Sequence, residues 1–254
     1  MKALVKYACG DGNVDIMDVE EPLCGENQVK VEVAFCGVCG TDIHVVHDTF
    51  RNYPPVILGH EFAGRAVEVG RSVIRVAPGD AVTVLGATAV TCGQCPYCRS
   101  GHFIFCSSRR GMGHGVNGAF TRYVVVRPDQ VYRIPAGLTL EEAALCEPFA
   151  AAVQAVTEVT QVRIGDTALI SGPGPIGLLC LKLLVDHIFY KQLTLAGSVC
   201  YTARTWDSVM EIFAQGRVRL TDLISAKLPL SEWRKGFDVC VKKEALKVLL
   251  YPEG

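Results

Sequence analysis

The sequence predicts an α/β protein with a β-rich first half, on three observations. From Lys2 to about Arg133, short runs of β-branched residues alternate with Gly, Pro and Asp, which is typical of strands joined by turns. An alanine-rich helical pattern follows over residues 138–159. An apolar run, a glycine-rich turn and an apolar helix then occupy residues 167–185, and together they indicate the opening of a βαβ unit.

The β-rich half is predicted to be a β-barrel or a sandwich. Its clearest strands lie at residues 29–33, 63–69, 81–84 and 123–126. Each contains valine and is bounded by turn-forming residues, a combination that favours strands. We therefore place the first domain at residues 1–150.

The helical part that follows has a recognisable start. Thr139 is the predicted N-cap, because its hydroxyl can accept a hydrogen bond from an amide of the first turn. Glu141 and Glu142 then lie where the helix dipole favours negative charge. Further helices are predicted over residues 176–185, from about 205 to 215, and over 231–240.

Composition excludes several classes of protein. Half of the 254 residues are hydrophobic, a fifth are charged and the net charge is −1, so no basic surface for nucleic acid is expected. The most apolar stretch, residues 167–185, is interrupted by Gly and Pro, which argues against a membrane span. No secretory signal is evident, so we expect a cytoplasmic location, where twelve cysteines are more often metal ligands or catalytic groups than disulfides.

Four cysteines form the strongest local motif, Cys92-x2-Cys95-x2-Cys98-x7-Cys106. Four thiolates within 15 residues can hold one tetrahedral zinc ion in a closed, structural site. An iron–sulfur cluster is the main alternative, but the x7 gap and the missing Cys-Pro differ from the ferredoxin spacing. Four unrelated cysteines are a weaker alternative, because free cysteines seldom cluster in this way.

A second constellation is dispersed over three segments, Cys39 to His44, Gly59 to Glu61, and Cys146 to Pro148. A thiolate, an imidazole and one or two carboxylates suit a zinc ion that keeps a replaceable water, as in catalytic sites. Each residue alone is weak evidence, and Cys36 ranks below Cys39 as a ligand. Four other histidines are assigned to structural roles: His47, His102, His114 and His187.

A third motif, Gly172-Pro-Gly174-Pro175-Ile176-Gly177, has the GxGxxG pattern between a predicted strand and helix. Such glycines allow a pyrophosphate to approach the N-terminus of a helix. The fingerprint also needs an acidic residue about 20 positions later to bind the ribose. Residues 191–197 offer none, so the dinucleotide site is incomplete.

Taken together, these motifs resemble the zinc-containing medium-chain alcohol dehydrogenases, especially the polyol (sorbitol-like) and threonine dehydrogenase branch. The resemblance rests on the segments beginning at Cys36, Gly59, Cys92, Cys146 and Gly172. It implies a GroES-like β-barrel catalytic domain, two zinc ions per chain, and NAD or NADP as the hydride acceptor.

The resemblance also implies residue roles. Cys39, His60 and Glu61 match the catalytic zinc ligands, and Glu147 matches either the fourth ligand or a carboxylate bonded to the zinc water. Cys92, Cys95, Cys98 and Cys106 match the structural zinc ligands. Thr41 and His44 match the proton relay, and Asp42 is expected to orient a ligand. The cofactor-binding positions would be Gly172, Gly174, Pro175, Ile176 and Gly177.

The chain departs from this family in its nucleotide-binding part. Family members have a six-stranded parallel sheet, whereas here the first strand and helix join directly to sequence resembling the last strand. We therefore expect a truncated Rossmann-type remnant at residues 151–199 and a segment at 200–254 that returns to the catalytic domain. The uncovered remnant should favour a homo-oligomer.

The leading hypothesis is a zinc-dependent dehydrogenase that oxidises a small secondary alcohol, a polyol or a threonine-like substrate. A zinc-binding scaffold or assembly partner that has lost the reaction is the alternative, favoured by the incomplete cofactor site. A zinc-free, quinone-reductase-type protein is disfavoured, because it would leave the matched ligand residues without a role.

Overall fold

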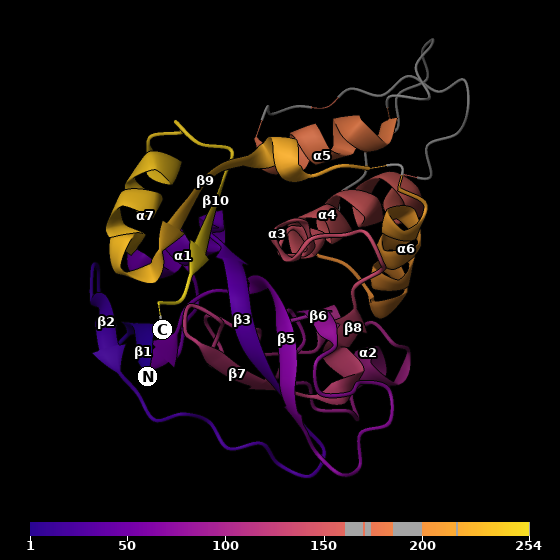
Figure 1. Ribbon diagram of the computed structural model, residues 1–254, viewed down its shortest axis with the longest axis horizontal. Helices are drawn as coiled ribbons and strands as arrows, with labels where there is room; N and C mark the ends of the chain where they lie inside the picture. Colours follow the sequence, from indigo (N-terminus) through magenta and orange to yellow (C-terminus); the bar gives the residue numbers. More distant parts are fainter. Residues whose placement is uncertain (161–169, 171–173, 185–199, 217, 254) are drawn as a thin grey trace.

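The computed structural model describes residues 1–160, 170, 174–184, 200–216 and 218–253. Its β-sheets occupy one side of the molecule and most of its helical residues the other (Figure 1). The α/β class and the β-rich first half predicted from the sequence are confirmed.

A small antiparallel sheet contains the N-terminus. Strand β1 (Lys2–Lys6) lies between β2 (Val14–Asp18) and β4 (Val56–Ile57). The strand β4 is short, and the chain leaves it directly towards His60. This sheet therefore fixes the start of one segment of the candidate site.

A larger sheet forms the body of the barrel. Strand β3 (Val29–Gly37) pairs with β5 (Glu61–Val69) along one edge, and on its other edge with β7 (Tyr123–Val126) and then with β10 (Lys247–Tyr251). Beyond β5 lie β6 (Ala81–Val84) and β8 (Val131–Arg133), and beyond β10 lies β9 (Ile224–Pro229). All four strands predicted in the first half are present.

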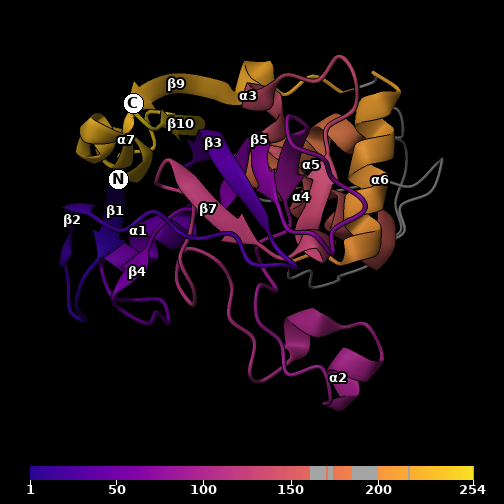
Figure 2. The same cartoon turned by 60° about the horizontal axis from the view of Figure 1, so that its bottom comes forward.

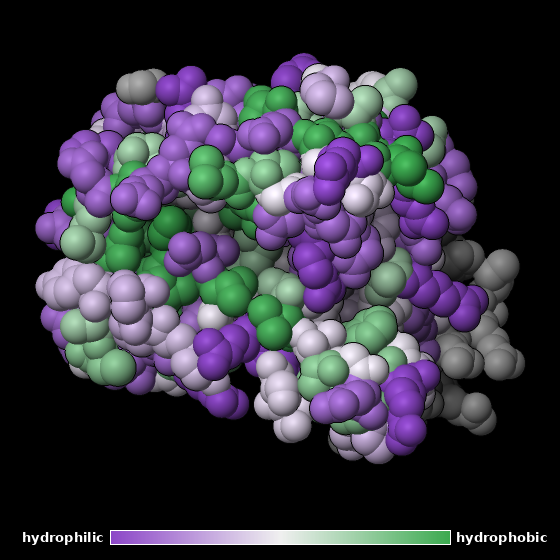
Figure 3. Space-filling view, turned by 90° about the horizontal axis from the view of Figure 1, so that it is seen from below, coloured by the Kyte–Doolittle hydropathy of each residue, from purple (hydrophilic) through white to green (hydrophobic). Residues whose placement is uncertain are grey.

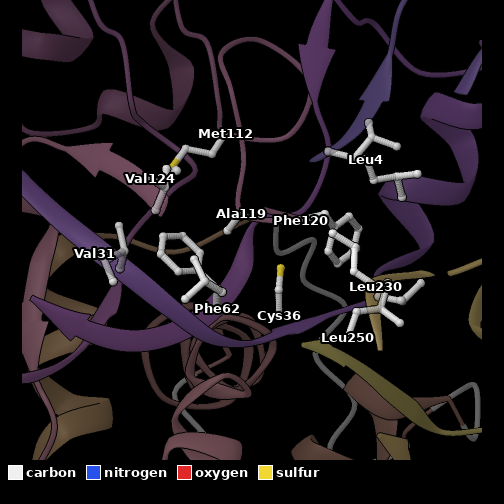
Figure 4. Packing of buried hydrophobic residues seen from close by; sticks show 14 of the residues in the cluster. Leu4, Val31, Cys36, Phe62, Met112, Ala119, Phe120, Val124, Leu230 and Leu250 are labelled. Atoms are coloured by element: carbon white, nitrogen blue, oxygen red, sulfur yellow. The ribbon is translucent and has the colours of Figure 1, made fainter. Parts of the chain in front are cut away.

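The hydrophobic core lies between the two sheets and helix α7 (Trp233–Val241), which buries Trp233 and Phe237 in it. Leu4, Val31, Phe62, Phe120 and Leu250 are buried there (Figure 4). Cys36, which is 1% exposed, lies among the same residues. Burial in this cluster explains Cys36 as a packing residue, in agreement with its low rank as a ligand.

The alanine-rich segment is helical, as predicted. Thr139 caps α3 (Leu140–Ala143) by accepting a bond from the Glu142 amide, and Glu142 reaches back to the Thr139 amide. This reciprocal pair is a capping box. The chain continues into α4 (Cys146–Val153) and a π-helical turn (Gln154–Val159), so α4 carries Glu147 in its first turn.

Two further helices pack against α4. Helix α5 (Pro175–Leu184) matches the helix predicted after the glycine motif, and α6 (Ala203–Ala214) matches the one predicted near residues 205–215. Helix α6 is amphipathic and buries Trp206, Val209 and Phe213. The strand predicted from residue 167 lies almost wholly outside the described residues, and no strand is assigned in the described part of 140–216.

The C-terminal segment returns to the barrel. Strand β9 is connected through α7 (Trp233–Val241) to β10, which lies parallel to β9 and antiparallel to β3 (Figure 1). In this pairing Leu249 lies opposite Gly37 and Leu250 lies opposite Cys36. The C-terminal strand is thus adjacent to the segment that leads into Cys39.

One surface cavity does not include the residues of the candidate metal sites. A cavity of about 650 Å³ is lined by residues of β4 and β7 and by none of the predicted ligand residues. On the face shown in Figure 3, apolar side chains gather in patches between polar ones. Among the described helices, none is long and apolar enough to cross a membrane.

Candidate metal centres

The four-cysteine motif forms a lobe that projects from the barrel (Figure 2). It contains α2 (Pro96–Arg99) and a 3-10 turn, η1 (Phe103–Phe105). One sulfur atom from each of four cysteines lies within 4.8 Å of the others: Cys92, Cys95, Cys98 and Cys106. All twelve cysteines are free thiols. The arrangement therefore has the donor set of a four-thiolate metal site.

Backbone amides support this cluster of sulfur atoms. The amide of Cys95 donates to the Cys92 sulfur at 3.3 Å, and the amide of Cys98 donates to the Cys95 sulfur at 3.5 Å. Amide hydrogen bonds, first from Gln94, lower the pKa of Cys92 to about 6. Loss of solvation and the neighbouring thiols raise the pKa of Cys98 to about 11. Thiols so close together can all ionise only beside a cation, so the donor set suits zinc.

The dispersed constellation converges on a second cluster. Donor atoms of Cys39, His60 and Glu61 lie within 4.8 Å of one another. Cys39 is the N-cap residue of α1 (Gly40–Val46), His60 follows β4, and Glu61 is the first residue of β5. A thiol, an imidazole and a carboxylate brought together in this way suit a zinc ion with one position left open.

Gly59 makes the approach of His60 possible. Its φ is +89°, a conformation that L-residues with side chains rarely adopt. A Cβ at this position would also lie 2.8 Å from the Phe120 ring and 2.9 Å from the Cys36 sulfur. The turn before His60 therefore requires glycine.

Asp42 ties two of the ligand segments together. It is 1% exposed, and its carboxylate accepts hydrogen bonds from the amides of Cys39 at 2.9 Å and Gly59 at 3.2 Å. The His60 Nδ1 atom is buried and lies 3.5 Å from Asp42 Oδ1. A carboxylate beside a ligand histidine orients the ring and increases its basicity.

The electrostatics of His60 also suit a cation site. Burial opposes a charge on its ring, but Asp42 and Cys39 outweigh burial and raise the pKa of His60 well above its ordinary value. The surroundings of His60 thus favour positive charge. A bound metal ion would supply that charge and leave the imidazole neutral.

Lys247 was not found from the sequence. Its ammonium donates to Glu61 at 2.6 Å and to the carbonyl of Val38 at 3.2 Å, and the pair of side chains is 5% and 1% exposed. Burial opposes the charge of Lys247, but Glu61 and Cys39 outweigh it and raise the pKa of Lys247. Since 186 residues separate Lys247 from Glu61, only the pairing of β10 with β3 reveals the contact.

Glu147 is not brought into the ligand group. Its Oε1 atom accepts a hydrogen bond from the Tyr201 hydroxyl at 2.5 Å. Burial and the charge of Glu61 raise the pKa of Glu147, against the opposing effects of His60, Tyr201 and Lys247. Glu147 therefore lies near the cluster without being one of its three donors, and Tyr201 is a second residue that the motifs did not reveal.

The predicted relay residues lie on α1. Thr41 is partly buried and His44 is exposed, three positions further along the helix. The ring of His44 lies 3.0 Å from the Thr49 hydroxyl, and no hydrogen bond joins Thr41 to His44. A proton path between these two residues needs another polar group.

The remaining histidines lie outside both clusters as far as the structure describes them. His47 is 2.8 Å from Asp11 and His102 is 3.1 Å from Ser100, both at the surface. Burial lowers the pKa of His114 to about 4, and its ring packs edge-on against Phe50. The fourth, His187, is outside the described residues.

The glycine motif is only partly described. Pro175 is the first residue of α5, Gly174 precedes it, and Ile176 and Gly177 follow in the first turn. A Cβ on Gly174 would have open space around it. Gly172 lies outside the described residues. The described part is the N-terminal end of a helix, the place where phosphate groups can bind.

The barrel and the two donor clusters define the class of the fold, a GroES-like barrel with two candidate metal sites, and comparison with known proteins gives its family. Residues 25–136 match the family model for the alcohol dehydrogenase GroES-like domain. Along 342 aligned positions, which cover 98% of this chain and 97% of the relative, the chain is 39% identical to D-arabitol-phosphate dehydrogenase of Enterococcus avium. The chain belongs to the zinc-type medium-chain alcohol dehydrogenase family.

Two other relatives match over a shorter range. Sorbitol dehydrogenase of Halalkalibacterium halodurans is 41% identical over 187 residues, 74% of this chain and 54% of the relative. L-threonine 3-dehydrogenase of Streptomyces avermitilis is 38% identical over 187 residues, 70% of this chain and 52% of the relative. The chain thus spans about half the length of each. An alignment of 342 positions also exceeds the 254 residues present, so this chain lacks part of what the first relative contains.

Solved structures agree with the fold. A zinc-binding dehydrogenase of Sinorhizobium meliloti 1021, described as bound to NADP, has a TM-score of 0.87 with 24% identity, over 99% of each chain. Galactitol-1-phosphate dehydrogenase of Escherichia coli has a TM-score of 0.83 with 20% identity, over 99% of this chain and 100% of that one. At this level of identity the likeness concerns the fold alone.

Proposed function

We propose that this chain is a zinc-dependent dehydrogenase that oxidises a secondary alcohol, of polyol or threonine type, and passes hydride to NAD or NADP. The observation that carries the proposal is the convergence of Cys39, His60 and Glu61 within 4.8 Å. A thiol, an imidazole and a carboxylate from two separate segments are not needed together for folding. The relatives named for sorbitol, D-arabitol phosphate and L-threonine support the substrate class.

In the proposed mechanism, Cys39, His60 and Glu61 hold a zinc ion, and Asp42 orients His60. A Zn²⁺ ion there supplies Lewis-acid polarisation of the substrate hydroxyl. The Thr41 hydroxyl would accept the proton of the alcohol and donate its own proton to an intervening polar group, and the exposed ring of His44 would take a proton from that group and release one to solvent. Cys92, Cys95, Cys98 and Cys106 hold a second zinc ion that stabilises the lobe.

The nicotinamide cofactor is proposed to bind through its phosphates at the N-terminus of α5. Gly174, Pro175, Ile176 and Gly177 lie there, and Gly172 completes the motif in the sequence. We assign residues 1–150 to the catalytic domain, 151–199 to a truncated nucleotide-binding part and 200–254 to the returning segment. Ile176 and Leu181 are each 43% exposed on α5, which supports a homo-oligomer.

Metal content and turnover together test this function. The wild-type chain should contain two zinc ions and oxidise a polyol, a secondary alcohol or threonine with NAD or NADP. Cys39→Ser should lose one ion and at least about a hundredfold in rate, because Lewis-acid activation is worth several kcal/mol. Cys9→Ser, an exposed thiol outside both clusters, is the matched control and should change neither. A zinc-loaded protein without turnover on any of these substrates would refute the dehydrogenase.

A second candidate is a zinc-binding scaffold that has lost the reaction. It is favoured by the helices α4, α5 and α6, which pack together without an assigned strand in the described part of residues 140–216. Calorimetric titration with NADH and NADPH separates the two functions. Saturable binding supports the dehydrogenase, and zinc-loaded protein that gives no heat with either cofactor supports the scaffold.

A further inference from the structure

Tyr201 lies outside the matched GroES-like domain and contacts Glu147, which lies near the candidate metal site. It is 3% exposed, and its hydroxyl donates to Glu147 at 2.5 Å. Surrounding groups raise the pKa of Tyr201 well above its ordinary value, chiefly through burial and the charge of Glu147. The Tyr201 hydroxyl thus donates its hydrogen bond to one carboxylate oxygen of Glu147.

Packing and the neighbouring backbone restrain the position of the Tyr201 side chain. Its ring packs edge-on against the fully buried Trp206, with 5.9 Å between ring centres. Cys200, directly before it, has a φ of +54°, which is uncommon for a residue with a side chain. Thr202, directly after it, is the N-cap of α6 and accepts a hydrogen bond from the Thr205 amide. The ring therefore has little freedom to move away from Glu147.

The segment that carries Tyr201 is also attached to the helix that carries Glu147. The Thr205 hydroxyl lies 2.8 Å from Gln154 Oε1 and 2.7 Å from Glu158 Oε1, both on the π-helical turn that continues α4. These contacts fix α6 against α4. The packing of α6 against α4 therefore helps to set the distance between the Tyr201 hydroxyl and Glu147.

Glu147, held in this way, lies outside the group formed by Cys39, His60 and Glu61. Carboxylates are common zinc ligands, and a fourth protein ligand would close the site as in structural zinc centres. We infer that Tyr201 is a positioning residue that restrains Glu147 from coordinating the metal, so that the fourth position stays open for the substrate oxygen. This inference rests on the proposed function, because it concerns the same metal site.

Cobalt in place of zinc provides the test, with azide as a probe of the open position. In wild-type protein loaded with Co²⁺, azide should shift the visible spectrum. In Tyr201→Phe, Glu147 should take the fourth coordination position, so the azide response should be lost. The affinity for Co²⁺, measured by competition with a chelator, should rise by about tenfold or more, which is the scale on which residues beyond the ligands change metal affinity. The double variant Tyr201→Phe with Glu147→Gln should regain the wild-type response.

Two controls keep this result interpretable. Tyr132→Phe removes another hydroxyl whose ring packs on Trp206, at 5.2 Å, but whose oxygen faces the Ala203 carbonyl, so its azide response should stay that of the wild type. Glu147→Gln alone should also leave the azide response intact, because Glu147 is not a ligand in the wild type. This single variant tests the inference even where Tyr201→Phe folds poorly.

Three results would overturn the inference. An unchanged azide response in folded Tyr201→Phe would show that the hydroxyl does not restrain Glu147. Loss of the cobalt ion from Glu147→Gln would show that Glu147 is a ligand already. A wild-type protein that takes up cobalt only at the four-cysteine cluster would refute the proposed function itself, a failure recognisable from the metal content alone.

Discussion

The two candidate metal centres are assembled in opposite ways. The four-cysteine cluster takes every ligand from 15 consecutive residues in a lobe that projects from the barrel (Figure 2). The cluster of Cys39, His60 and Glu61 takes its ligands from two segments that the fold brings together. Lys247 of the C-terminal strand donates a hydrogen bond to Glu61. Glu147, which accepts a hydrogen bond from Tyr201, lies near the cluster. The first is a local property of the chain, and the second is a property of the whole fold.

This difference determines what each centre depends on. The lobe has α2 of four residues and a 3-10 turn of three, too little structure to bury much apolar surface. We therefore expect its order to depend largely on an ion that would join the four thiolates. The dispersed cluster lies against a large core and a buried ion pair, so its geometry is held by the fold and the metal adds chemistry. Substitutions can test this division.

The largest effect is expected for Cys98→Ser. In small zinc-dependent domains the metal contributes about 10 to 16 kcal/mol of folding free energy, so loss of this thiolate should disorder residues 92–106 and leave the barrel folded. Metal content should fall by one ion, protease should cut within the lobe, and the azide response of the cobalt at the other centre should remain. Cys24→Ser, a thiol outside both clusters, is the control. Global unfolding of Cys98→Ser would contradict the local character of the lobe.

A smaller but global effect is expected for Lys247→Met. The substitution keeps the apolar stem of the side chain but leaves Glu61 buried without its partner, which typically costs about 3 to 5 kcal/mol. Metal-free protein should lose this much stability in urea unfolding, and zinc should restore part of it, because the ion compensates the charge of Glu61.

A surface pair supplies the control for Lys247. Lys227 donates to Glu141 at 2.7 Å, but the two side chains are 45% and 31% exposed. Lys227→Met should therefore cost less than about 1 kcal/mol. Equal losses for the two lysine variants would show that the buried pair does not support the dispersed cluster.

The contrast between the centres also explains what the sequence could predict. The spacing of the four cysteines is a local pattern, and the strands at 29–33, 63–69, 81–84 and 123–126 follow from local alternation. The cap at Thr139 likewise depends on a residue only three positions away. Features of this kind are encoded within a short window of the chain.

Lys247 and Tyr201 could not be found in this way. Lys247 lies in an apolar strand, and its partner Glu61 is 186 residues away. Tyr201 follows a stretch without a clear pattern, and its partner Glu147 is 54 residues away. Both contacts depend on strand pairing and helix packing, which a single sequence does not reveal. The hydrogen bond between Glu147 and Tyr201 is likewise a contact that the motif around Glu147 does not predict.

The smallest expected effect concerns the link between the two segments of the dispersed cluster. Asp42 accepts hydrogen bonds from the amides of Cys39 and Gly59 and faces His60 Nδ1. Asp42→Asn keeps the shape but replaces one acceptor oxygen by an amide donor, so one buried amide loses its partner and the imidazole faces a donor. Metal affinity at this centre should fall by about 10- to 100-fold, measured by chelator competition, while the lobe retains its ion.

The matched control for Asp42 is Asp80→Asn. Asp80 also accepts a hydrogen bond from a loop amide, that of Ala77 at 2.9 Å, but it contacts neither cluster. It should therefore leave both metal affinities unchanged. If Asp42→Asn weakened the ion of the four-cysteine lobe as much as that of the dispersed cluster, the two centres would be coupled through the fold. The division between a local and a global centre would then be wrong. The hydrogen bonds of Asp42 involve only Cys39 and Gly59, and its charge faces His60, yet their loss would have changed the metal affinity of the four-cysteine cluster.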